Sequence, residues 1–81
     1  MLDSIKSEKI LISIGAKLEK ARKAKELSLR ALAEQANVEH VQITKLEKGK
    51  LNASILTILA IAEELEMDLN DLFNYKADLK K

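Results

Sequence analysis

The residues from Glu39 to Lys50 carry the side chains best suited to binding a ligand. Lys45 can donate to guanine O6 and N7, and the amide of Gln42 can pair with adenine. Glu39 can accept from cytosine N4, and Val41 can contact a thymine methyl group. These groups suit the recognition of base edges in a DNA groove.

Two lysines lie at the end of this segment, on either side of a glycine. Lys48 and Lys50 flank Gly49, where flexible cations are better placed to bind phosphate oxygens than to read bases. We therefore predict phosphate contacts for both lysines.

The composition argues against enzyme and metal chemistry. The chain has no Cys and one His, His40, so it lacks the ligands for a zinc site. No nucleophile–base pair, paired carboxylates or phosphate-cradling loop can be assembled from the other residues. We expect no enzymatic activity, no metal and no cofactor.

The elements that position these residues are expected to be helices. Hydrophobic residues make up 47% of the chain, aromatic residues only 2%, Pro is absent and Gly occurs twice. Aliphatic cores of this kind favour helices packed on helices. With 81 residues, the chain is predicted to be a single compact all-α domain.

The first helix is predicted from Ile10, because apolar residues recur from there at intervals of three or four. Residues 1–9 form a leader in which Ile5 can extend this helix. The domain is expected to span residues 10–76, and residues 77–81 are a polar tail.

A sharp turn is predicted between the second and third helices. Ser28 can cap the second helix, and Asn37 after it tolerates the left-handed conformation. The third helix buries Ile43 and Leu46 and is closed by Gly49 in a left-handed cap. Its outward residues are predicted to be Glu39, His40, Gln42 and Lys45, with Val41 and Thr44 beside them.

Two more helices complete the predicted domain. Ser54 opens a fourth helix through Glu66, and Asp68 opens a short fifth. The inward residues are predicted to be Ile55, Ile58, Ala62 and Leu65 on the fourth helix, and Leu69, Leu72 and Phe73 on the fifth.

Charge is distributed unevenly along a chain whose net charge is only +1. Residues 1–50 hold eleven Lys or Arg against seven Asp or Glu, whereas residues 51–81 hold three against six. Such a chain can present a cationic face to phosphates and keep an acidic face away from them. The alternative is an ordinary solvated surface.

The segment from Ser28 to Gly49 and the residues after it resemble the Cro/CI-type (Xre-like) helix-turn-helix family of phage repressors and bacterial regulators. The matching residues are Leu32-Ala33, Ala36, Val38, Ile43, Leu46-Glu47-x-Gly49, Ser54, Thr57, Leu65 and Leu69 through Leu72-Phe73. The resemblance covers about Ile14 to Tyr75 and implies a lambda repressor-like fold of five helices. It also implies a sequence-specific regulator that places its third helix in the major groove of double-stranded DNA.

The resemblance assigns roles to particular residues. His40, Val41 and Lys45 lie where related repressors contact base edges. Arg22 and Glu47 match an ion pair that joins the first helix to the end of the third, with the guanidinium aimed near the DNA backbone.

Five positions depart from the family, and two of them are Asn37, where Gly is common, and Ala53, where Pro often precedes Ser54. Ser28 matches the start of the family's second helix, but Leu29 replaces a Gln whose side chain reaches DNA, so Leu29 offers only its backbone amide to phosphate. Glu39 replaces the family's Ser or Thr cap. Glu26 occupies a position where relatives often have Gly, and a left-handed Glu26 would be strained.

An apolar surplus on the fourth helix predicts a protein partner. Leu56 and Ala60 exceed what the inward face needs, and exposed aliphatic patches on small domains mark interaction sites. We expect a homodimer on a palindromic operator. The alternative is a wider buried face within one chain.

Three functions remain open at this point. The chain can be a small repressor or a controller of the kind found beside restriction–modification genes, a DNA-binding antitoxin held by a protein partner, or a helical interaction module that has lost DNA binding. The longest apolar run, residues 55–62 with Thr57 inside it, is shorter than the ~20 residues of a membrane span, so we expect a cytoplasmic protein with no membrane contact.

Overall fold

The core contains at least one fully buried aliphatic side chain from each of the five described helices. The computed structural model describes residues 3–50 and 53–74, and its helices are α1 (Ser4–Ala24), α2 (Leu29–Ala36), α3 (His40–Glu47), α4 (Ile55–Glu64) and α5 (Leu69–Leu72). In the same order, Leu18, Leu32, Ile43, Ile61 and Leu72 are at most 1% exposed. The described residues contain no strand, so the all-α prediction is confirmed.

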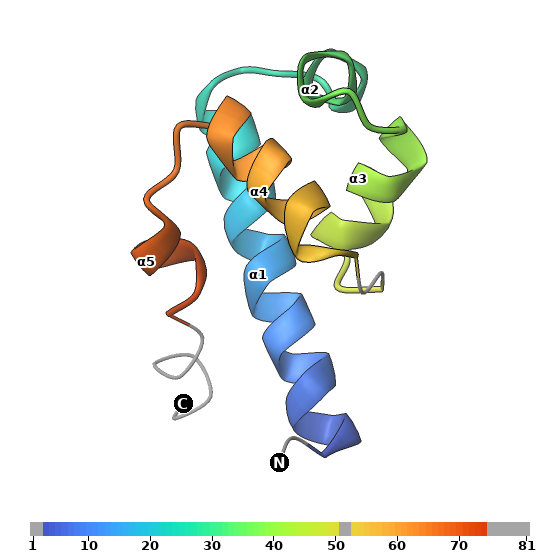
Figure 1. The fold of residues 1–81 in the computed structure, drawn as a ribbon, viewed down its shortest axis with the longest axis vertical. Coiled ribbons are helices and arrows are strands. Elements are labelled where there is room, and N and C mark those ends of the chain that lie inside the picture. Colours follow the sequence, from blue (N-terminus) through green and yellow to red (C-terminus); the bar gives the residue numbers. More distant parts are fainter. Residues whose placement is uncertain (1–2, 51–52, 75–81) are drawn as a thin grey trace.

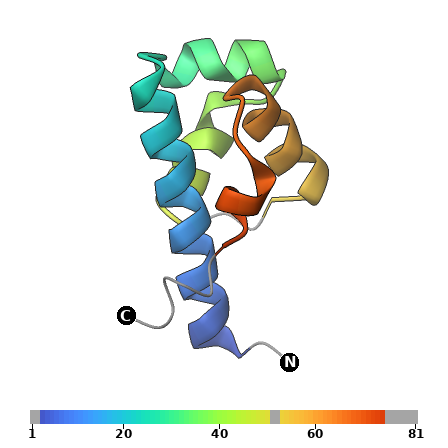
Figure 2. The same cartoon turned by 90° about the vertical axis from the view of Figure 1, so that its left-hand side faces the viewer.

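Helix α1 is longer than its apolar periodicity indicated. The Asp3 side chain caps it by accepting a hydrogen bond from the Lys6 backbone N–H at 2.8 Å. Residues 4–9 therefore belong to the helix, and they project beyond the other described helices (Figures 1 and 2).

Within the described residues, no helix combines the length and hydropathy needed to cross a membrane. The boundary predicted between residues 76 and 77 lies outside the described residues.

Helices α3 and α5 pack against α1, and α4 packs against α2. Figure 1 shows α3 and α5 on opposite sides of α1, and Figure 2 shows α2 lying across the C-terminal end of α1. Helix α3 packs against both α1 and α2, which leaves the remaining side of α3 available to a ligand.

Four helices end on a residue in the left-handed conformation. The φ angles are 58° at Glu26, 56° at Asn37, 71° at Gly49 and 54° at Glu66. At each of them the next residue donates a backbone hydrogen bond to the carbonyl five residues earlier, as from Leu27 to Arg22 at 3.1 Å. The turns predicted at Asn37 and Gly49 are confirmed. The fourth helix was predicted to run through Glu66, which is wrong, because α4 ends at Glu64 and Glu66 takes the left-handed conformation.

Two residues predicted to face inward do not. Ile55 is 55% exposed, and the inner face of α4 is made by Ile58, Ile61, Ala62 and Leu65 instead. Leu69 is 42% exposed, because α5 has a single turn and buries only Leu72 completely. Both misplaced residues are the first of their helices, where the apolar stripe runs past the edge of the core.

Candidate nucleic-acid interface

A three-residue turn joins α2 to α3. Asn37, in the left-handed conformation, ends α2, and the Val38 backbone N–H donates to the Ala33 carbonyl at 3.0 Å. Val38 is half-buried and packs against the core, so it holds the turn in place. On α3, Ile43 and Leu46 are 1% and 2% exposed, which fixes the face that the helix turns to solvent.

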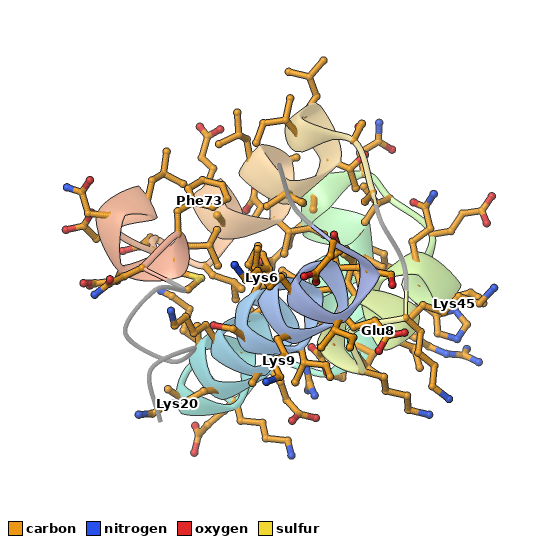
Figure 3. The ribbon with its side chains drawn as sticks, turned by 90° about the horizontal axis from the view of Figure 1, so that it is seen from below. Lys6, Glu8, Lys9, Lys20, Lys45 and Phe73 are labelled. Carbon is orange, nitrogen blue, oxygen red and sulfur yellow. The ribbon has the colours of Figure 1, made fainter. Side chains whose placement is uncertain are left out.

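The outward face of α3 carries the side chains that the sequence predicted there. Glu39, His40, Val41, Gln42 and Lys45 are all exposed. Val41, an apolar residue, is 47% exposed on this otherwise polar surface. Lys45 projects outward from α3, away from Phe73 at the end of α5 (Figure 3).

Thr44 lies at the edge of this face. Its side chain is half-buried, and its hydroxyl donates to the His40 carbonyl at 3.1 Å. This internal bond occupies the hydroxyl proton and leaves the oxygen lone pairs and the methyl group for a ligand.

The caps at the start of α2 and α3 differ. The Ser28 hydroxyl accepts from the Ala31 backbone N–H at 3.0 Å, as its position predicted. Leu29 is half-buried against the core, so its side chain belongs to the fold and its backbone amide lies in the first turn of α2. Glu39 caps α3 without a side-chain hydrogen bond, which leaves its carboxylate on the surface.

Arg22 and Glu47 join α1 to the C-terminal end of α3. Arg22 Nε and Nη2 donate to the two Glu47 oxygens at 2.7 and 3.1 Å, and Nη1 donates to the Leu27 carbonyl at 2.8 Å. The side chains are 11% and 5% exposed. The hydrogen bond with Glu47 raises the pKa of Arg22 despite its desolvation, so the guanidinium keeps its charge. The ion pair is present as predicted, whereas contact of Arg22 with DNA stays a prediction.

The two lysines predicted to bind phosphate follow α3 directly. Lys48 and Lys50 are exposed on either side of Gly49. The Lys50 backbone N–H donates to the Lys45 carbonyl at 2.9 Å, and that of Gly49 donates to Leu46 at 3.0 Å. The backbone carrying both ammonium groups is therefore fixed to the last turn of α3.

The apolar surplus on α4 faces outward at one end. Leu56 is 74% exposed, the most exposed large hydrophobic residue in the described ranges, and Ala60 one turn later is half-buried. Leu56 is thus surplus to the core of one chain, as the sequence indicated, and Ala60 is so only in part.

Sequence reasoning overlooked Arg30. This exposed residue of α2 borders an open hollow of about 680 Å³ at the turn into α3. The lining residues are Arg30, Ala33, Glu34, Asn37, Val38, Glu39 and His40. The signal was available, because Arg30 lies off the apolar stripe of α2. Among the described residues, no three His, Cys, Asp or Glu side chains are grouped to hold a metal ion.

Comparisons with known proteins agree with this geometry. A helix-turn-helix family model matches residues 18–72. The control protein C.MunI from Mycoplasma sp is 35% identical over 66 residues, which cover 80% of this chain and 89% of that protein. The crystal structure of the restriction-modification controller protein C.AhdI from Aeromonas hydrophila matches with a TM-score of 0.73 and 32% identity, over 78% of this chain and 96% of that one.

Proposed function

The chain belongs to the helix-turn-helix family of DNA-binding transcriptional regulators, and from this premise we propose that it is a controller-type regulator that inserts α3 into the major groove of its operator. The observation that carries the proposal is the division of α3 into two faces. Ile43 and Leu46 anchor the helix in the core, while five neighbouring positions from Glu39 to Lys45 are exposed together.

Base recognition is assigned to the exposed face of α3. The major groove is about 12 Å wide and admits a helix, so side chains on that face can reach base edges. Lys45 donates to guanine, Gln42 pairs with adenine, and Val41 packs on a thymine methyl group. Glu39 and His40 at the start of the helix read adjacent positions, with Glu39 accepting from cytosine.

Phosphate binding is assigned to groups that flank this face. Lys48 and Lys50 follow α3, and the first turn of α2 presents Ser28 and the amide of Leu29. Such contacts set the register of the protein on the duplex without reading sequence. Thr44 lies at the boundary between the two sets.

Dimerisation is proposed through the exposed end of α4. Leu56 and Ala60 form a patch within the acidic part of the chain, where residues 51–81 hold three Lys or Arg against six Asp or Glu. That part is unsuited to face phosphates, so it is free to meet a second copy across a two-fold axis.

The relatives favour a controller over an antitoxin. One is a control protein, and the other is a restriction-modification controller. On this proposal the protein acts in the cytoplasm on double-stranded DNA, by binding rather than by catalysis.

Selection of bound sites from a random duplex pool tests the proposal. We expect enrichment of a palindrome whose half-sites are about one helical turn, 10–10.5 base pairs, apart. The variant Lys25→Ala, which removes a cation paired with Glu66 rather than one on α3, should select the same site. Recovery of no preferred sequence at low salt would refute sequence-specific binding, and would favour an interaction module that has lost its operator.

A further inference from the structure

The two glycines of the chain lie at one helix crossing. Gly15 is in the middle of α1, and Gly49 immediately follows α3. A glycine in the interior of a helix weakens the helix, so its presence calls for a reason in the packing. The crossing of α1 with the end of α3 supplies that reason for both residues.

At Gly15 the backbone of α3 takes the space of a side chain. A Cβ on Gly15 would overlap the carbonyl oxygen of Leu46 and lie 3.0 Å from the carbonyl carbon and oxygen of Glu47. These are backbone atoms of α3, so no side-chain rotation can relieve the overlap. Any side chain at position 15 must push the last turn of α3 away from α1.

Gly49 makes a similar close contact in the opposite direction, from the end of α3 onto α1. A Cβ there would lie 2.7 Å from Ile12 Cγ1, 2.8 Å from Ile12 Cα and 2.9 Å from Ile12 N. Position 49 also has a φ of 71°, which favours glycine independently. The turn between Lys48 and Lys50 is thus seated directly on the backbone of α1.

The Arg22–Glu47 pair fastens the same end of α3 two turns further along α1. Its donor and acceptor atoms are 2.7 and 3.1 Å apart, and the pair is largely buried. The C-terminal end of α3 is therefore held to α1 at two places, by close backbone contact and by a bidentate ion pair. The N-terminal end of α3 is attached through the turn after α2 instead.

We propose that Gly15 is a positioning residue for operator recognition, because it sets the distance between α1 and the end of α3, which carries Lys45 and is followed by Lys48 and Lys50. The inference rests on the proposed function of α3. A side chain at position 15 moves the C-terminal end of α3 away from α1. The N-terminal end of α3, with His40 and Val41, keeps its position against α2. The base contacts of α3 and the phosphate contacts of the lysines can then no longer form at the same time on one duplex.

Specific binding is more sensitive to this displacement than non-specific binding. Base contacts need hydrogen bonds at fixed geometry, whereas the attraction of lysines to phosphates tolerates small shifts and depends mainly on charge. The substitution Gly15→Ala changes no charge. It should therefore lower the preference for the operator while leaving the affinity for random DNA and its salt dependence almost unchanged.

The experiment compares Gly15→Ala with wild type on the selected operator and on a random duplex of equal length, by fluorescence anisotropy at several salt concentrations. We expect operator affinity to fall about tenfold or more, with random-duplex affinity within about twofold and the same salt slope. Circular dichroism at the assay temperature checks that the variant is folded. The matched control is Ala16→Gly, which makes the reverse exchange at the next position of α1, where the side chain is exposed. This variant should keep the wild-type preference for the operator over the random duplex.

A folded Gly15→Ala protein with wild-type preference would overturn the proposal, as would an equal loss of affinity for both duplexes. If Gly15→Ala does not fold, Gly49→Ala places a Cβ at the same crossing from the other side, and the same two measurements decide. A wild type that selects no operator would instead contradict the proposed function.

Discussion

Lys45 and Lys50 are both exposed, but only Lys45 projects from the face of α3 that is turned to solvent. We predict that Lys45→Ala relaxes the preference at one base position and costs about 1–3 kcal/mol on the operator, as loss of a good base contact does. Binding to a panel of operators with single base changes measures this effect.

Lys50→Ala should weaken all duplexes by a similar factor, because Lys50, on the turn after α3, is proposed to contact phosphate alone. The slope of log affinity against log salt should become shallower by about one unit. The two variants control for each other, since each removes one ammonium group. Equal losses on operator and random DNA in both would refute the division into base and phosphate contacts.

Glu26 is a non-glycine residue held at a φ of 58°. Because the left-handed region is unfavourable for side chains with a Cβ, we predict that Glu26→Gly raises the free energy of unfolding by up to about 1 kcal/mol. Urea denaturation followed by circular dichroism gives the value. Asn37→Gly is the matched control and should gain less, since Asn tolerates this conformation better; a lower stability for Glu26→Gly would contradict the strain.

The exposed residues of α3 were largely predictable from sequence, because the periodicity of a helix fixes which side chains share a face. Ile43 and Leu46 determined the exposed set on α3, and Ser28 and Asn37 marked both ends of α2. The close contact of Gly15 with Leu46 was not predictable, since it depends on the distance between two helices and leaves no periodic signal.

At the scale of helices, the Arg22–Glu47 pair holds α3 to α1 and predicts a measurable loss of stability when it is broken. Glu47→Gln leaves a buried guanidinium without its counter-charge, and we expect this to cost about 3 kcal/mol of unfolding free energy. Glu66→Gln is the control. It breaks the 3.2 Å pair with Lys25, where Glu66 is 81% exposed, and should cost no more than about 0.5 kcal/mol.

Chemical denaturation of both variants against wild type distinguishes the two pairs. Similar small losses for Glu47→Gln and Glu66→Gln would show that the buried pair does not hold α3 in place.

The ends of helices were less predictable than their centres. Ile55 and Leu69 continue the apolar pattern of α4 and α5, but each stands in the first position, where the neighbouring helices no longer cover it. Periodicity predicts the direction in which a side chain points. It does not predict how far the neighbouring helices extend to cover that side chain. Residues 4–9, which are polar except for Ile5, belong to α1 for a related reason. The cap at Asp3, and not burial, determines where this helix begins.

At the scale of the whole molecule, the exposed end of α4 predicts a dimer. In the proposed dimer, Leu56→Glu would place like charges opposite each other across the two-fold axis, so dimer affinity and operator affinity should fall together while the monomer stays folded. Sedimentation equilibrium with circular dichroism measures assembly and folding. Glu63→Gln, on an exposed position already polar, serves as a control for changes in surface charge. A helical wild type that remains monomeric at concentrations on the order of tens of micromolar would refute the dimer.

The contribution of one fully buried side chain from every helix has a consequence for the lifetime of the protein in a cell. These five side chains belong to one hydrophobic cluster, so opening of any of the described helices uncovers that cluster and is expected to be coupled to global unfolding. Proteolytic turnover through opened states then follows the global stability of the fold. Residues 4–9 of α1 lie outside this cluster, so their amides should exchange fast, while amides hydrogen-bonded within the rest of the described helices should converge on a single free energy of opening.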